Sequence, residues 1–172
     1  AALPVVLDGA GNEFDGDPVL SGRADLARYT RLGDLLREKN RPQAALIEYD
    51  KADDPTAPAS PLLLVRKALC HDALNHPAEA RSFVDEGVAL YPEFTPLQVT
   101  RGRLLDKAGE GASALVAWRA AHDLNPYDPE VQEALFRGYT AAGKSADALR
   151  HRGYLRILQT GGTTEPKPPP AR

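Results

Sequence analysis

The stretch Thr95–Pro126, TPLQVTRGRLLDKAGEGASALVAWRAAHDLNP, decides the fold of this chain. Its landmarks recur at a spacing of 34 residues: Gly102, Ala114, Ala121 and Pro126 are preceded by Ala68, Ala80, Gly87 and Pro92, and Ala114 is followed by Ala148. A fixed period between about 20 and 50 residues, with small residues at the same phase, is typical of stacked supersecondary units. The sequence therefore predicts a repeat protein.

Each repeat reads as two helices joined by a short turn. Apolar residues at helical spacing begin after Asp25, which can cap the first helix. We expect an array over residues 23–159, with helix pairs at about 25–54, 61–92, 95–126 and 128–159. Prolines and Gly-containing turns supply the stops between helices. The longest interruption is the Pro-rich segment 53–61.

The two ends of the chain lack the helical period. Residues 1–22 contain turn residues around a short apolar run, and we expect an irregular, hairpin-like segment there. Residues 160–172 offer nothing that could anchor a core, so we expect a disordered tail. The chain contains no Met, even at residue 1, and we expect it to be processed or excised from a longer protein.

Composition excludes several classes of function. A net charge of −3 gives no electrostatic reason to expect nucleic acid. No apolar run approaches the roughly 20 residues that a membrane span needs, so we expect no membrane insertion. Cys70 is the only cysteine and can form no intrachain disulfide. No phosphate loop, nucleophile motif or metal-ligand spacing is present, so we expect no catalysis, metal or cofactor; the cellular compartment is unknown.

The repeats resemble the tetratricopeptide repeat over about residues 25–159. Residues at the positions of its motif are Tyr29, Leu32, Gly33, Leu36, Ala45 and Tyr49 in the first repeat, Leu64, Ala68, Ala80 and Pro92 in the second, Gly102, Leu105, Ala114, Trp118 and Pro126 in the third, and Leu135, Tyr139 and Ala148 in the fourth. The resemblance implies an all-α, right-handed superhelix of about four helix-turn-helix repeats, an α-solenoid.

Small and large residues are expected to face each other within a repeat. Gly33 and Gly102 would allow the close approach of two helices, while Tyr49 and Trp118 would fill the space between neighbours. In the fourth repeat Phe136 replaces the small residue and Arg152 replaces the aromatic one. We therefore expect the last repeat to pack differently or to act as a polar end cap.

In proteins of this family, function lies on the concave face lined by the first helix of each repeat. We expect this groove to hold an apolar anchor of a partner segment and to offer arginines to its carboxylates. The candidate groove residues are Leu62, Val65, Leu69, Val99, Arg103 and Arg137. The alternative is that Leu62 and Val65 belong to the core and that the arginines form a solvated face.

Some relatives clamp a C-terminal carboxylate with Lys and Asn on that face. Thr30, Asp34, Val65 and Leu69 stand at those places here, so we expect no such clamp.

The function we expect is that of a non-catalytic scaffold for a protein or peptide partner with apolar and acidic residues. The Arg- and Ala-rich composition favours a bacterial origin. One alternative is an accessory C-terminal segment of a larger enzyme, such as a hydrolase or peptidase. Another is self-association into a homo-oligomer through the imperfect fourth repeat.

Overall fold

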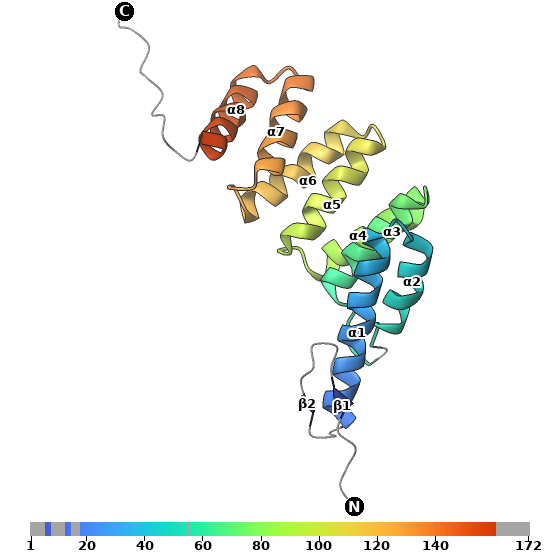
Figure 1. Ribbon diagram of the computed structural model, residues 1–172. Helices are drawn as coiled ribbons and strands as arrows, with labels where there is room; N and C mark the ends of the chain where they lie inside the picture. Colours follow the sequence, from blue (N-terminus) through green and yellow to red (C-terminus); the bar gives the residue numbers. More distant parts are fainter. Residues whose placement is uncertain (1–5, 8–12, 15–17, 55, 161–172) are drawn as a thin grey trace, which may run out of the picture. The chain divides into compact units, whose positions relative to one another are not determined.

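The structure is a computed structural model that describes residues 6–7, 13–14, 18–54 and 56–160. The fold is all-α, as predicted, apart from one pair of two-residue strands (Figure 1). The strands β1 (Val6–Leu7) and β2 (Glu13–Phe14) are antiparallel, with Val6 opposite Phe14. The helices are α1 (Pro18–Glu38), α2 (Pro42–Lys51), α3 (Pro61–Ala73), α4 (Pro77–Leu90), α5 (Thr95–Lys107), α6 (Gly111–Leu124), α7 (Pro129–Ala141) and α8 (Ser145–Thr160).

The chain divides into two compact units, unit 1 (Ala1–Pro92) and unit 2 (Glu93–Arg172). Unit 1 contains α1 to α4, coloured blue to green in Figure 1, and unit 2 contains α5 to α8. Within each unit the helices pack in consecutive pairs, and the second helix of one pair packs against the first helix of the next, α2 on α3 and α6 on α7. Each unit therefore holds two helix-turn-helix repeats.

The turn inside each repeat has the same geometry. A residue with positive φ follows each first helix, and these residues are Asn40, Asn75, Gly109 and Gly143. The next residue donates its backbone N–H to a carbonyl five positions earlier, as in Arg41 to Leu36 and Glu110 to Leu105, both at 2.9 Å. This is the Schellman motif, in which Gly or Asn takes the left-handed conformation. Proline at the start of α2, α3, α4, α5 and α7 then favours the next helix.

The pairing of small with large residues inside repeats is confirmed. A Cβ added to Gly33 of α1 would overlap the ring of Tyr49 on α2. In unit 2, a Cβ on Gly102 of α5 would lie 2.5 Å from the indole of Trp118 on α6. Tyr49 and Trp118 are both buried and belong to the cores of their units. Only glycine therefore lets the two helices of these repeats approach so closely.

The fourth repeat packs differently, as expected. Arg152, which stands at the aromatic position, is exposed, whereas the preceding His151 is only 6% exposed. The His151 ring stacks on Tyr139 of α7, and its Nδ1 lies 2.7 Å from Oε1 of Gln132. Because the amide Nε2 of Gln132 donates to the Pro126 carbonyl, its Oε1 is the acceptor and the His151 Nδ1–H is the donor. The buried ring has thus moved by one position along the helix.

The first helix begins earlier than expected. It starts at Pro18, not near Asp25, so residues 18–22, which we expected to be irregular, are helical. Proline is well suited to a first helical position, because its φ is already helical and it has no N–H to leave unpaired. The expectations for residues 1–5, 8–12, 15–17 and 161–172 lie outside the described residues.

Candidate partner-binding surfaces

The six predicted groove residues lie on first helices of both units. Leu62, Val65 and Leu69 are on α3 of unit 1, whereas Val99, Arg103 and Arg137 are on α5 and α7 of unit 2. We call the surface formed by the first helices of one unit its first-helix face.

The first-helix face of unit 1 presents one exposed apolar side chain from the predicted set. Leu62 is 42% exposed and Leu69 is half-buried, while Val65 is only 7% exposed. Val65 therefore contributes to packing, and a partner could contact Leu62 and the open side of Leu69. The interpretation of Leu62 as a core residue does not fit its exposure.

Asp34 on α1 joins three helices of unit 1. Its carboxylate accepts two hydrogen bonds from Arg66 of α3, at 2.7 and 2.8 Å, and a third from the Tyr49 hydroxyl of α2, at 2.8 Å. Burial, and then the Asp34 carboxylate, raise the pKa of Tyr49 far above its ordinary value. Asp34 is therefore occupied inside the unit, and bidentate pairing of this kind fixes helix geometry.

The Pro-rich interruption of unit 1 is fastened by Lys67. This α3 side chain is buried and pairs with Asp50 of α2, at 2.7 Å, and with Asp53 of the following loop. Burial alone would lower the pKa of Lys67, but hydrogen bonds to the two carboxylates outweigh it and raise that pKa. Two anions around one buried cation satisfy its charge, so Lys67 is a structural group.

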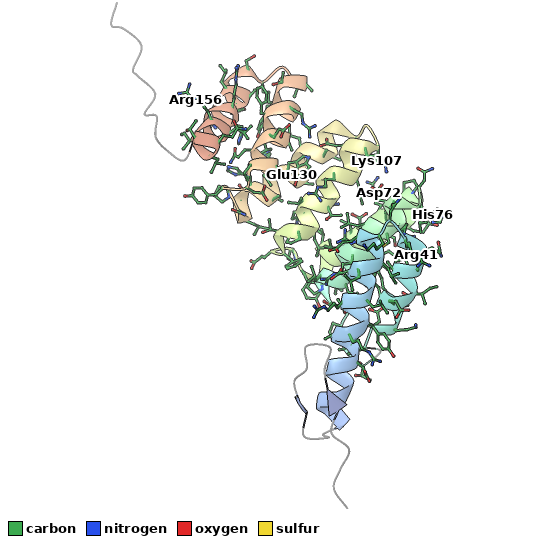
Figure 2. All side chains as sticks on the ribbon, viewed as in Figure 1. Arg41, Asp72, His76, Lys107, Glu130 and Arg156 are labelled. Atoms are coloured by element: carbon green, nitrogen blue, oxygen red, sulfur yellow. The ribbon has the colours of Figure 1, made fainter. Side chains whose placement is uncertain are left out.

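On the first-helix face of unit 2, Arg103 is already paired. Its Nε and Nη2 donate to the two carboxylate oxygens of Glu130 on α7, each at 2.5 Å, and Glu130 is labelled in Figure 2. These hydrogen bonds raise the pKa of Arg103 further. The pair is exposed to solvent, so a partner carboxylate can still reach the guanidinium. Val99, by contrast, is 8% exposed and belongs to the core of the unit.

Arg137 is the least constrained of the predicted residues. Its side chain is 64% exposed, and its Nη2 is 3.9 Å from Oδ2 of Asp106. The same Asp106 oxygen accepts a hydrogen bond from Nε1 of Trp118 at 2.9 Å. Arg137 therefore has a distant, shared partner and is free to turn toward an external carboxylate.

Arg137 also lines a cavity of about 800 Å³ in unit 2, which we call the α6–α7 pocket. The remaining lining residues are Asp106, Gly111, Ala112, Leu115, Val116, Arg119, Gly138, Ala141, Ala142 and Lys144. Sequence reasoning missed Arg119 and Lys144. They lie on a second helix and in a turn, outside the face that the family pattern highlights.

Comparison with known proteins rests on structure alone. No protein-family profile and no curated protein matches the sequence. The solved structure of MamA is similar over 83% of this chain and 84% of its own, with a TM-score of 0.69 and 16% identity. YrrB, described as a TPR protein with an unusual peptide-binding site, is similar over 85% and 74%, with a TM-score of 0.63 and 17% identity.

A third similar structure contains a bound peptide. It is the first TPR of Spaghetti (RPAP3) with the HSP90 peptide SRMEEVD, similar over 70% of this chain and 95% of its own, with a TM-score of 0.64 and 21% identity. The fold is that of the tetratricopeptide-repeat (TPR) proteins. At identities this low the similarity shows the fold alone, and any ligand has to be argued from the chain's own residues.

The TPR positions that would form a carboxylate clamp are otherwise engaged in unit 1. The Thr30 hydroxyl donates to the Leu26 carbonyl at 2.9 Å, Asp34 pairs with Arg66, and Val65 is buried.

Two side chains that could carry chemistry, Cys70 and His71, are engaged in packing. Burial raises the pKa of the Cys70 thiol, which lies in the core of unit 1. The His71 ring stacks on Phe83 with centroids 5.3 Å apart. Within the described part of the chain, no group of three or more His, Cys, Asp or Glu residues could hold a metal ion. No helix there is long and apolar enough to cross a membrane.

Proposed function

We propose that this chain is a protein-interaction scaffold and that each first-helix face, taken by itself, binds a partner segment carrying apolar and acidic side chains. The observation that carries the proposal is the pair Arg103 and Arg137, two exposed guanidinium groups at equivalent positions of consecutive first helices in unit 2. The Nη1 of Arg103 takes no part in the two hydrogen bonds to Glu130. The guanidinium of Arg137 is 3.9 Å from its carboxylate partner, Asp106. Arginines in such a row match carboxylates spaced along a peptide.

The exposed Leu62 on α3 supports an apolar contribution from unit 1. Because Leu62 is exposed, its side chain contributes little to the core, and it offers a contact for an apolar anchor. The HSP90 peptide bound to the similar structure, SRMEEVD, combines Met and Val with Glu and Asp. That composition supports a partner of the same chemistry for this chain.

The test is selection of a random 12-residue peptide display library on the immobilised chain, followed by binding of the enriched peptide to variants. We expect enriched peptides to combine Asp or Glu with a large apolar residue. Arg103→Glu should weaken binding of a peptide held by unit 2 about tenfold or more, and Leu62→Glu should do the same for a peptide held by unit 1, because each substitution places a carboxylate on the face. Fluorescence anisotropy measures the dissociation constants.

Two exposed positions off the first-helix faces provide matched controls. Ile47 lies on α2 and Arg152 on α8, both second helices, and Ile47→Glu and Arg152→Glu should bind the peptide as the parent does. The proposal fails if no peptide is enriched, if the enriched peptides are basic, or if neither Arg103→Glu nor Leu62→Glu binds the peptide more weakly than the control variants.

Self-association is a second candidate function, favoured by an apolar patch in unit 2. Tyr127, Tyr154 and Ile157 are exposed, and they line a cavity of about 230 Å³ with Pro126 and Leu158. If this patch joins two copies, sedimentation should show a mass that rises with concentration, and Ile157→Glu should abolish the rise. A constant monomer mass at high micromolar concentration would exclude this function.

A further inference from the structure

The α6–α7 pocket is distinct from the first-helix face of unit 2. Most of its lining comes from α6, a second helix, and from the C-terminal half of α7, with only Asp106 from α5. Its volume of about 800 Å³ is within the range of cavities that bind ligands. Arg137 belongs both to this pocket and to the first-helix face, so one segment could occupy the two together.

A glycine keeps the floor of the pocket open. A Cβ on Gly138 would lie 3.0 Å from Cδ1 of Leu115, so any larger residue at this position would cover the Leu115 side chain. The neighbouring Val116 is 64% exposed, which is a large exposure for a branched apolar residue in the middle of a helix. The floor therefore offers apolar surface that no part of the described chain covers.

Three cations surround this floor, namely Arg119, Arg137 and Lys144. Within the described residues, Arg119 and Lys144 have no ion-pair partner, and Arg137 has only the Asp106 oxygen at 3.9 Å. Asp106 is the single carboxylate among the lining residues, and it already accepts the Trp118 N–H. The pocket is thus locally positive in a chain whose net charge is −3.

We propose that the α6–α7 pocket binds a peptide segment of a partner protein, with a large apolar side chain on Leu115 and Val116 and with Asp or Glu side chains on Arg119 and Lys144. This proposal rests on the proposed function, and within unit 2 it places the partner's apolar side chain in the α6–α7 pocket, beside the first-helix face of that unit. The cations around the pocket complement acidic side chains of the peptide, and the uncovered apolar floor complements its large apolar side chain. A peptide fits better than a small molecule, because the exposed floor would leave a small ligand largely in water.

The experiment uses the peptide enriched from the random 12-residue library on the full chain. One variant reverses the rim charges, Arg119→Glu with Lys144→Glu, and a second fills the pocket, Ala141→Trp. Each should weaken binding of the fluorescein-labelled peptide about tenfold or more. The matched control for the filling variant is Ala146→Trp, on an exposed position of α8 that does not line the pocket. Circular dichroism confirms that all variants are folded.

The outcomes separate the pocket from the first-helix face. Loss of binding in both pocket variants, with parent-like binding by Ala146→Trp, supports the pocket. Parent-like binding by both pocket variants, together with loss in Arg103→Glu, overturns the pocket and leaves the proposed function standing. Enrichment of no peptide, or of peptides without Asp and Glu, overturns both.

Discussion

The Nδ1–H of His151 donates to Oε1 of Gln132 at 2.7 Å, and the Gln132 amide donates in turn to the Pro126 carbonyl. This chain of two hydrogen bonds ties α8 to α7 and to the turn before α7. It occupies a repeat in which the large aromatic residue of the earlier pairs is replaced by the exposed Arg152. A proton added at Nε2 would leave the Nδ1–H bond in place but would put a positive charge on a buried ring, and burying that charge costs free energy.

Acid should weaken the fourth repeat through His151. Burial, and then the neighbouring His122 and Arg150, lower the pKa of His151 below its ordinary 6.5. Below pH 6.5 the unfolded chain therefore binds a proton that the folded chain resists, so the free energy of unfolding falls as pH falls. The slope for one proton is at most about 1.4 kcal/mol per pH unit. Urea unfolding at pH 7.5 and 5.5 measures it.

The matched variants for this pH effect are His151→Phe and His76→Gln. The first keeps a ring against Tyr139 and removes the titrating group, so its stability should change less between pH 7.5 and 5.5 than that of the parent. His76 is exposed, and its replacement should leave the parent's pH dependence intact. An unchanged pH dependence in His151→Phe would refute the assignment to His151.

Adding one carbon at Gly102 should destabilise unit 2. The new Cβ of Gly102→Ala would meet the Trp118 indole, and overpacking of this kind costs typically about 1–3 kcal/mol. Gly153→Ala is the control, since nothing lies within 4 Å of a Cβ there and alanine favours the helix by about 0.5–1 kcal/mol. The midpoint temperature of thermal unfolding should therefore fall for Gly102→Ala and rise for Gly153→Ala. Equal shifts would contradict the close approach.

The left-handed turn residues should accept asparagine and reject branched residues. At Gly109, where φ is +76°, Gly109→Val should cost about 1–2 kcal/mol. Gly109→Asn should cost less, because Asn40 and Asn75 adopt this conformation at the equivalent turns. Chemical denaturation of both variants gives the comparison. A valine variant as stable as the asparagine variant would show that the turn relaxes.

The half-buried pair Asp34–Arg66 should couple more strongly than an exposed pair. In a double-mutant cycle with alanine, we expect a coupling energy of about 1 kcal/mol or more for this bidentate pair. The exposed pair Asp147–Arg150 on α8 should give about 0.5 kcal/mol or less. Raising the salt concentration should reduce the second value proportionally more than the first. Equal couplings would remove the structural role given to Asp34.

The sequence predicted the elements that depend on local chemistry. The 34-residue period fixed the helix pairs, and the contacts of Gly33 with Tyr49 and of Gly102 with Trp118 follow from the small and large residues at equivalent positions. The helical start at Pro18 was missed, because four glycines in residues 1–22 outweighed a proline that could begin a helix.

The candidate surfaces were harder to predict, because they depend on which side chains of neighbouring helices meet. Arg103 and Arg137 look equivalent in the sequence, yet Glu130 pairs closely with the first and only the distant Asp106 approaches the second. The burial of Val65 and Val99 likewise depends on packing between helices, which periodicity alone cannot resolve. Arg119 and Lys144 become related only through the cavity that they share.

The recurring turn has a consequence for how such a chain can change length during evolution. The Gly102 to Trp118 packing and the Glu110 to Leu105 hydrogen bond both lie inside Thr95–Pro126, so this segment encodes its own hairpin. A gene duplication that copies the whole segment preserves both features, whereas an insertion of a few codons inside a helix shifts one partner away from the other. The fold therefore tolerates the gain or loss of complete repeats better than the gain or loss of a few residues inside a helix.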